Sequence, residues 1–576
     1  MRFLVLITGL LTVGAACNAQ TPEAGKGETG LPARAVQSDV APPDGVEARD
    51  EGEGPFDRLI IRGATVIDGA GAPPAGPIDI VVEGDRIIQI RPVGSPGLPI
   101  DPARRPKADG AREIDAAGKF VLPGFVSLHG HIHTPETGQG VAPDYIFKLW
   151  LMHGITTMRD LGNERGAAWT AQAAAASAAN AITAPRIYPY PVFRGWSAGE
   201  VDTPEQARAR IRQLKAEGAK GVKFFGAPEE ILWAGLEEAK TQGLRTTMHH
   251  AQVDVAHANV LDTSQRGLNS MEHWYGLPEA LFDDKVLQDY PLTYNYLDEQ
   301  NRFEEAGRLW AQAARPGSER WDYVLETLLE RDFAIVPTLT IYSASRDWMR
   351  ARRAEWHDTF TMPSLWKFFA PDRNAHGSYW FDWGTEQEVA WRDNYRRWMQ
   401  FINAYKNAGG KVGVGEDAGY IYSTYGFGYI NELELLREAG FHPLEVLRSA
   451  TLIGAKILGA EKDIGSIQVG KKADLLIIGE NPLANLKVLY ATGHIKLNED
   501  GVPVRAGGIE TVIKDGIVYD AKALADDVRA TVAAEKERAG IPGGPMPIVG
   551  FAYGPVAGKN SDEAGPDADE STEPDQ

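Results

Sequence analysis

The sequence of 576 residues has a single cysteine, Cys17, so no disulfide can form within one chain. It also lacks an excess of basic residues, because 59 Lys and Arg stand against 79 Asp and Glu and the net charge is −20. Nucleic-acid binding requires a basic face and is therefore not expected. The uncharged apolar run from residue 3 to residue 16 is shorter than the roughly 20 residues of a membrane-spanning helix.

The negative charge is concentrated at the two ends of the chain. Residues 20–56 carry 8 acidic and 3 basic side chains, and residues 559–576 carry 7 and 1. These two segments account for −5 and −6, or −11 of the total charge of −20. The rest of the chain is only mildly acidic, and its 43% hydrophobic and 24% charged residues are ordinary for a globular protein.

The N-terminus has the pattern of an export signal, with Arg2 before the short apolar run, and we assign residues 1–19 to it. Cys17 follows the segment VGAA and resembles the lipidation site of bacterial lipoproteins, although Gly14 stands where a larger aliphatic residue is usual. Cleavage near Ala19 is the alternative and would remove the cysteine. We expect a protein exported to a bacterial envelope, either periplasmic or held at the membrane only through a lipid on Cys17.

The composition also changes along the chain. Residues 20–56 are rich in Pro, Gly, Ala and acidic side chains without hydrophobic periodicity, which predicts a flexible linker. Residues 522–576 contain one helical pattern followed by an acidic tail. Between these ends, β-branched runs alternate with Ala/Glu/Arg-rich helical stretches, and this alternation favours a parallel sheet with crossover helices. The length leaves room for a barrel of about 250 residues and a second domain.

The strongest candidate site is the pair His129 and His131, at the end of the apolar segment VLPGFVSLHGHIH. Side chains at i and i+2 on a strand project from the same face. Two imidazoles in this arrangement can bind one metal ion.

Further candidate ligands each end an apolar or β-branched run. They are Lys223 in AKGVKFFG, His249 and His250 in LRTTMHHAQ, His273 in GLNSMEHW and Asp417 in GKVGVGEDAG. Burying a lysine ammonium among apolar residues is costly, so Lys223 indicates a chemical role. Adjacent strand residues point in opposite directions, so only one of His249 and His250 can be a ligand, and the sequence leaves that choice open.

The order HxH, Lys, His, His, Asp, together with its flanking segments, resembles the metal-dependent amidohydrolase superfamily, which includes dihydroorotase, imidazolonepropionase and prolidase-like enzymes. The resemblance extends from about residue 57 to about residue 521. It implies an α/β fold: a (β/α)8 TIM-like barrel over residues 124–455, and a small β-sandwich domain built from residues 57–123 and 456–521.

The resemblance also implies a binuclear metal site. His129, His131 and Asp417 would hold one divalent cation, and His273 with one of His249 and His250 would hold the second. Lys223, if carboxylated by carbon dioxide, would bridge the two, and zinc is the metal we expect. A bridging water activated by the metals would be the nucleophile, and Asp417 would carry its proton to the leaving amine.

We therefore predict a hydrolase of amide C–N bonds acting on small peptides or N-acyl amino acids, and a homo-oligomer. Residues 274–400 hold 10 of the 14 tryptophans, so an aromatic or apolar substrate group is expected, although spacings such as Trp391, Tyr395 and Trp398 also suit helical burial. The alternatives are a cyclic amide or lactone hydrolase, a heterocycle deaminase, which Lys223 argues against, and a surface-tethered binding protein with a silent metal site.

Three positions depart from the family pattern. Ser127 stands where an acidic residue is frequent, which could weaken the support of a ligand. Glu416 replaces a hydroxyl residue and should point away from Asp417, as a buried partner or a loop residue. His133 is an additional histidine, and we favour a surface or supporting role for it over metal binding.

Overall fold

The computed structural model describes residues 40–195, 199–372, 376–379 and 382–541. The predicted signal with Cys17, the aromatic Trp380 and the acidic tail lie outside these residues. None of the described helices is both long and apolar enough to cross a membrane.

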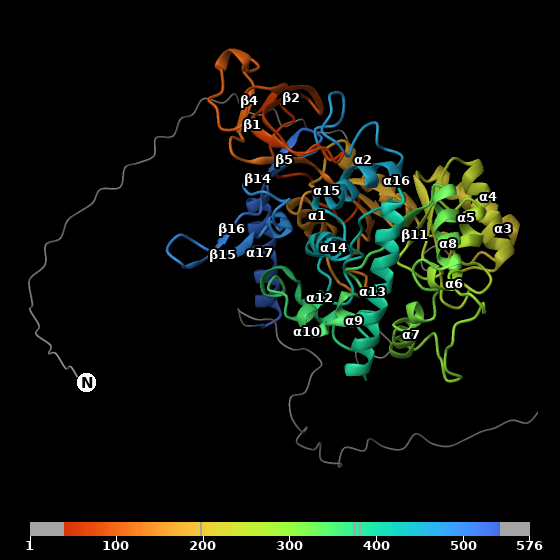
Figure 1. The fold of residues 1–576 in the computed structure, drawn as a ribbon. Coiled ribbons are helices and arrows are strands. Elements are labelled where there is room, and N and C mark those ends of the chain that lie inside the picture. The colour runs from red at the N-terminus through yellow and green to blue at the C-terminus, as the bar shows by residue number, and fades with distance from the viewer. Residues whose placement is uncertain (1–39, 196–198, 373–375, 380–381, 542–576) are drawn as a thin grey trace, which may run out of the picture.

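Eight parallel strands form the central barrel, and Figure 1 labels one of them, β11. They are β6 (Phe125–Gly130), β7 (Ile155–Asp160), β8 (Arg186–Pro189), β9 (Gly221–Phe224), β10 (Arg245–Met248), β11 (Ser270–Glu272), β12 (Ala334–Val336) and β13 (Lys411–Val412). Strands β6 to β8 pair in one group and β9 to β13 in another. The Phe193 amide donates to the Lys223 carbonyl and the Leu128 amide to the Val414 carbonyl, both at 2.8 Å, and these bonds join the two groups. The predicted TIM-like barrel is confirmed.

Helices follow the barrel strands and cover them. They are α1 (Pro143–Met152), α2 (Gly166–Ala178), α3 (Pro204–Ala216), α4 (Glu229–Thr241), α5 (Val260–Gln265), α6 (Leu277–Ala280), α7 (Glu299–Ala306), α8 (Glu319–Glu330), α9 (Ser343–Arg346), α10 (Trp348–Arg352), α11 (His357–Phe360), α12 (Pro363–Phe368), α13 (Thr385–Asn407), α14 (Phe427–Glu438), α15 (Pro443–Arg448) and α16 (Gly454–Leu458). The short helices between β12 and β13 lie in the aromatic-rich region and precede the long α13. This region therefore forms a helical insertion in the barrel.

Helix α3 illustrates how the sequence specifies these elements. Thr203 caps its first turn in a capping box with Gln206, and a proline follows the cap, where its missing N–H costs nothing. Ala207, Ile211 and Leu214 recur at spacings of four and three and are buried. One face of the helix therefore packs against the barrel while its charged residues remain in solvent.

A second sheet is built from both ends of the chain, at the top of Figure 1. It comprises β1 (Leu59–Val66), β2 (Ala75–Glu83), β3 (Arg86–Pro92), β4 (Arg112–Asp115), β5 (Phe120–Pro123), β14 (Leu475–Ile478), β17 (Ile509–Lys514) and β18 (Ile517–Asp520). The Ile87 amide donates to the Lys471 carbonyl at 2.9 Å, so the free end of β3 returns to the segment before β14. The expected sandwich is thus one curled sheet that encloses its own core.

Two further elements complete the C-terminal part. Strands β15 (His494–Leu497) and β16 (Pro503–Ala506) form a separate hairpin. Helix α17 (Ala521–Arg538) lies where the helical pattern was found and packs against α1.

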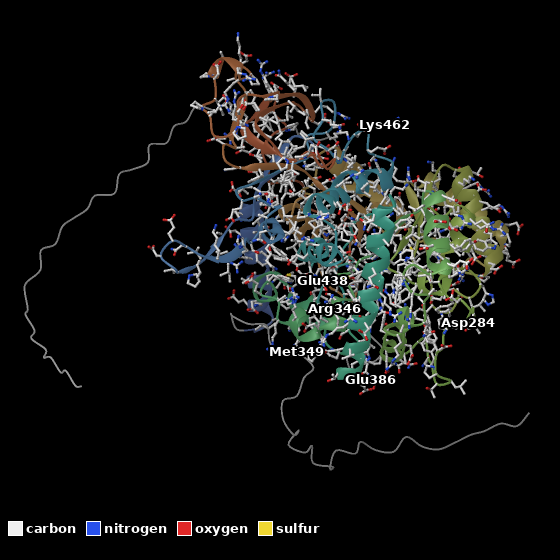
Figure 2. The ribbon with its side chains drawn as sticks, in the orientation of Figure 1. Asp284, Arg346, Met349, Glu386, Glu438 and Lys462 are labelled. Carbon is white, nitrogen blue, oxygen red and sulfur yellow. The ribbon has the colours of Figure 1, made fainter. Side chains whose placement is uncertain are left out.

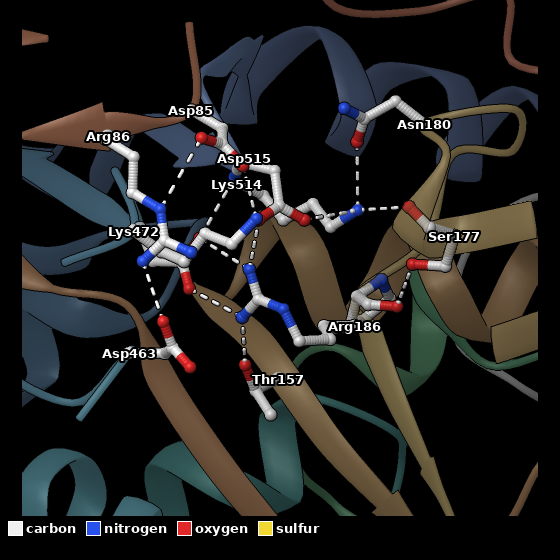
Figure 3. A network of polar contacts seen from close by, with 12 residues as sticks. Asp85, Arg86, Thr157, Ser177, Asn180, Arg186, Asp463, Lys472, Lys514 and Asp515 are labelled. Carbon is white, nitrogen blue, oxygen red and sulfur yellow. Dashed lines mark hydrogen bonds and ion pairs between the residues drawn. The ribbon is translucent and has the colours of Figure 1, made fainter. Parts of the chain in front are cut away.

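A buried ion network joins the second sheet to the barrel (Figure 3). Arg186 at the start of β8 pairs with Asp474 at 2.7 Å and with Asp515. Lys472 and Lys514 each approach Asp515 at 3.1 Å. Burial alone would raise the pKa of the Asp515 carboxyl, but the surrounding cations hold that pKa well below its usual range. The opposite charges compensate one another, so the network can be buried at the contact between the two domains.

The prediction of a flexible linker over residues 20–56 is wrong for residues 40–56. From residue 40 onward the chain lies on the body: the Arg49 amide donates to the Ala181 carbonyl at 2.7 Å and the Glu53 amide to the Val518 carbonyl at 2.9 Å. The side chain of Val46 is buried. Composition indicated a linker because the segment has no hydrophobic periodicity of its own. Its backbone groups instead form hydrogen bonds with other parts of the chain.

Candidate metal centre

The carboxyl ends of β6 and β13 bring three predicted ligands together. The Nε2 atoms of His129 and His131 each lie 3.3 Å from Oδ1 of Asp417. One donor atom from each of the three residues falls within 4.8 Å of the others, and all three side chains are buried. A Cβ atom at Gly415 would lie 2.5 Å from the Cβ of His129, so the absent side chain lets β13 approach β6 this closely.

The hydrogen bonds of three imidazoles orient their Nε2 lone pairs toward this centre. Nδ1 of His129 lies 2.7 Å from the Glu272 carboxylate, and Nδ1 of His131 lies 3.1 Å from the Gly162 carbonyl. Nδ1 of His273 lies 2.6 Å from the Thr338 hydroxyl, which donates to the Pro337 carbonyl and therefore accepts from the ring. Each Nδ1 thus carries the proton, and each Nε2 is left to bind a cation. The donor set fits a divalent metal ion.

A second group lies beside the first. Nε2 of His273 is 3.7 Å from Oδ2 of Asp417, and the rings of His273 and His249 are 4.6 Å apart. Burial holds the pKa values of both histidines well below the usual range, which favours the neutral form that binds metal. Lys223 on β9 lines the same cavity, and burial lowers the pKa of its ammonium to about 8.

His250 lies apart from this group, although it was a candidate ligand beside His249. Its Nε2 contacts the Thr263 hydroxyl at 2.9 Å, and the ring packs against the backbone of Gly276. Only His249 lines the cavity, because consecutive side chains at the end of β10 face opposite ways. Of the two histidines that the sequence left open, the structure directs His249 to the centre.

A buried pair behind the centre was missed in the sequence. Arg159 on β7 donates to the Glu272 carboxylate at 2.5 Å, and the other oxygen of Glu272 accepts from His129. Burial alone would raise the pKa of Glu272, but the Arg159 cation and His129 hold that pKa well below its usual range. In the sequence, this pair could have been noticed only as a charged residue in each of two short buried strands, Arg159 in TTMRD and Glu272 in SME. Neither indicated its partner, because the two residues meet only in the closed barrel.

The three departures from the family pattern have distinct environments. Ser127 is buried, and its hydroxyl has no hydrogen-bond partner among the described residues. Glu416 is buried and has hydrogen-bond partners, which was one of the two roles expected for it. Its carboxylate accepts from the Trp150 indole and from two backbone amides near the start of α14. Burial raises the pKa of this carboxyl to about 8. His133 is not at the surface, because Nδ1 contacts the Tyr425 hydroxyl at 2.6 Å and Nε2 the Tyr420 hydroxyl at 3.1 Å.

Three residues of the centre have a left-handed backbone. The φ angles of His273, Thr338 and Asp417 are 61°, 48° and 50°. Side chains other than glycine rarely adopt this region, and strained residues of this kind concentrate at functional sites. The left-handed conformation thus occurs at two candidate ligands and at the residue whose hydroxyl contacts Nδ1 of His273.

The candidate metal ligands lie in the wall of a cavity of about 610 Å³. Its outer wall comes from the segments after β11 and after β12, and it includes Tyr296, Arg302, Phe303, Tyr342 and Phe368. Arg302 is buried, its guanidinium lies 4.5 Å from the Tyr296 ring centre, and its Nε donates to Gln252 at 2.7 Å. No tryptophan among the described residues lines this cavity.

The tryptophans instead form core. The side chains of Trp274, Trp310, Trp391 and Trp398 are fully buried, and the rings of Trp274 and Trp398 are 5.8 Å apart. The spacing of Trp391, Tyr395 and Trp398 therefore reflects burial of one face of α13. The pocket takes its aromatic character from tyrosine and phenylalanine.

Imidazole and carboxylate donors gathered at the carboxyl ends of barrel strands are typical of metal-binding (β/α)8 barrels. The model of the amidohydrolase family matches residues 396–532 of the chain. The candidate ligands His129, His131, Lys223, His249 and His273 lie before the matched residues.

Relatives and solved structures are similar to the chain over longer ranges. The dihydroorotase of Anaeromyxobacter dehalogenans (strain 2CP-C) is 29% identical over 250 residues, which are 41% of this chain and 51% of the dihydroorotase. The chain thus spans about half the length of that relative. A crystal structure of a Xaa-Pro dipeptidase with bound methionine has a TM-score of 0.53 at 18% identity, covering 80% of this chain and 100% of its own. A bottromycin amidohydrolase has a TM-score of 0.56 at 19% identity, covering 84% and 91%.

Proposed function

We propose that this protein is a metal-dependent hydrolase of amide bonds in small peptides or N-acyl amino acids. The observation that carries the proposal is the convergence of His129, His131, Asp417, His273 and His249 at the base of one cavity. A purely structural metal site closes its coordination sphere, whereas this group opens onto a space large enough for a small peptide. The dipeptidase with a similar fold supports the substrate class.

His129, His131 and Asp417 would hold one cation, and His249 and His273 would hold a second. Lys223 would bridge them as a carbamate, and its lowered pKa of about 8 leaves part of the amine neutral at pH 7, as reaction with carbon dioxide requires. Divalent cations bound there would polarise the scissile carbonyl and lower the pKa of a water. The short distances among the donors support this assignment of ligands.

Asp417 has the position to move a proton. One of its oxygens faces His129 and His131, and the other faces His273 and the cavity. A carboxylate at this point can accept the proton of an attacking water and return it to the nitrogen of the leaving amine. Asp417→Asn keeps the shape of the side chain but removes this acceptor.

Arg302 supports a substrate that carries a carboxylate. Its guanidinium is buried in the wall of the cavity, 4.5 and 4.8 Å from the ring centres of Tyr296 and Phe303, and its Nη1 lies 3.5 Å from the Glu299 carboxylate. Arginine is suited to bidentate recognition of carboxylates, and the adjoining rings suit an apolar side chain. The free carboxylate of a dipeptide or of an N-acyl amino acid meets both requirements.

The test is release of amine from a panel of dipeptides and N-acyl amino acids by the protein loaded with zinc in bicarbonate, with Asp417→Asn as background. We expect turnover by the wild type alone. Arg302→Met should raise KM at least about tenfold for substrates with a free carboxylate, and should leave their amide-capped forms unchanged.

Failure across this panel, in protein that holds two metals, would refute the proposed substrate class. Turnover of dihydroorotate or another cyclic amide instead would favour the alternative that the dihydroorotase relative suggests. Turnover that survives Asp417→Asn would contradict its role in proton transfer.

Export and lipidation at Cys17 stay predictions, which labelling of the cysteine with a fatty acid in cells would test.

A further inference from the structure

A hairpin that belongs to neither domain sheet projects from the body of the protein (Figure 1). It comprises β15, β16 and their turn, residues 494–506, and we call it the arm. Its two strands pair only with each other among the described residues. A two-stranded hairpin is marginally stable alone in water, so an arm of this kind gains from contact with another surface.

The arm exposes apolar side chains that are normally covered. Ile495, Leu497 and Val502 are 62%, 66% and 52% exposed. Ile495 and Leu497 alternate along β15 and so share one face of the hairpin. Contiguous exposed apolar side chains on a soluble protein commonly mark an interaction surface.

The tip of the arm is acidic and unpaired. Glu499 and Asp500 lie in the turn, which Asn498 orders by accepting the amide of Val502 at 2.8 Å. Both acidic side chains are exposed, and neither makes an ion pair within the described ranges. The base of the arm, in contrast, is fixed: Lys496 pairs with Glu480 at 2.7 Å, and Arg505 with Glu355 at 2.7 Å. The tip is therefore presented in a defined direction, away from its own body (Figure 1).

A second cavity, of about 650 Å³, lies at the base of the arm between α9, α10 and α14. We call it the arm-side cavity. Ile495 from the arm lines it, and so do Arg346, Arg350 and Arg353. Figure 2 labels Arg346 beside Glu438, and the two form an ion pair at 2.7 Å. Four acidic residues also line the cavity: Asp347, Glu355, Glu434 and Glu438. Three of them already have partners, because Glu438 pairs with Arg346, Glu434 with Lys487 and Glu355 with Arg505. Arg350 and Arg353 make no ion pair in the part of the chain that the structure describes, so they are the cations that remain to meet an acidic group.

One chain thus carries both halves of a complementary contact. Its acidic tip cannot reach its own arm-side cavity, because the arm leaves from the edge of that cavity and extends outward. A second copy related by a two-fold axis can offer its tip to the cavity and receive the first tip in return. Such an interface uses the same surface twice and closes as a dimer.

We propose that the arm is a dimerisation element. In the dimer, Glu499 and Asp500 of each copy enter the arm-side cavity of the other and pair with Arg350 and Arg353 there. Ile495 and Leu497 pack across the two-fold axis, which removes their apolar surface from water. This interface is independent of the metal centre and of the proposed activity.

The test is sedimentation velocity of the full chain at low ionic strength, where charge pairs between exposed groups are least screened. We expect a dimer for the wild type. Glu499→Lys/Asp500→Lys should weaken dimerisation at least about a hundredfold, because like charges then face each other. Arg350→Glu/Arg353→Glu should do the same. As the matched control, Asp283→Lys/Asp284→Lys makes the same charge change at an exposed site far from Arg346, as Figure 2 shows for Asp284.

Mixing the two monomeric variants decides the question. Each interface in the mixed pair unites a lysine tip with a glutamate cavity or a wild-type tip with a wild-type cavity, so heterodimers should form again. Recovery also demonstrates that both variants are folded. A monomeric wild type, a dimer that survives tip reversal, or a mixture without heterodimers would overturn the proposal. So would a monomer whose Arg350 and Arg353 bind a small anion such as citrate.

Discussion

Replacing Glu272 by glutamine tests whether the pair behind the centre controls metal binding. The carboxylate accepts from Nδ1 of His129 at 2.7 Å through one oxygen and from Arg159 and Thr247 through the other. Glutamine has one oxygen only. If that oxygen remains with Arg159, the amide NH2 faces Nδ1 of His129, and the imidazole must move its proton to Nε2 to avoid two opposed donors.

The magnitude follows from this change of tautomer. Nε2 of His129 then carries a proton and no longer offers a lone pair to the cation. A hydrogen bond to a charged group contributes about 1.5–3 kcal/mol, and loss of a residue that orients a ligand costs about 10–100-fold in metal affinity. We therefore expect the zinc dissociation constant to rise by about 10–100-fold.

Competition with a chromogenic chelator measures that constant directly. The matched control is Glu279→Gln, a buried glutamate that accepts the Gly276 amide at 2.8 Å and lies outside the cavity lining. The control should lower the melting temperature without changing the zinc dissociation constant. Unchanged zinc affinity in folded Glu272→Gln protein would refute the reasoning.

Three further predictions concern other buried groups. Asp515→Asn should lower the free energy of unfolding by about 3 kcal/mol at pH 7, because Arg186 loses a buried partner. Since the folded pKa of Asp515 is depressed, urea melts should give the full difference above about pH 4 and a smaller one below it, whereas an equal loss at every pH would contradict this. Elemental analysis should give about one zinc per chain for His249→Asn and two for His250→Asn, and the opposite result would be inconsistent with the geometry. Glu432→Gln should destabilise the protein by about 1–3 kcal/mol in thermal melts, because its two carboxylate oxygens each accept a backbone amide after β12 at 2.9 and 2.7 Å. A variant as stable as the wild type would argue against this role.

The candidate ligands could be proposed from the sequence because each ends an apolar run. Parallel strands in a closed barrel bring those ends to one mouth, so His129, Lys223 and Asp417 could be assigned to one place without knowledge of the loops. Strand alternation also required that His249 and His250 face opposite ways. Which of them faces inward depends on the register of β10 with β9 and β11, and that information is three-dimensional.

Residues that act through a partner were not predictable in this way. Glu272 and Arg159 lie 113 positions apart, and each alone is a charge in an apolar strand. Residues 40–56 have the composition of a linker, yet their backbone hydrogen bonds are supplied by segments near Ala181 and Val518. The tryptophans indicated an aromatic pocket, but rings such as those of Trp274 and Trp398 pack against one another in the core. In each case the deciding contact joins distant parts of the chain.

The outer sheet has a consequence for how the protein can be made. Strand β5 lies between β1 and β14, so a strand near the start of the chain awaits a neighbour that is synthesised after the entire barrel. Until then β5 presents an unpaired edge, which can pair with other chains. A product that stops after α16 would contain all eight barrel strands and still keep this edge open. Pairing of β14 therefore removes an edge at which incomplete chains are expected to associate.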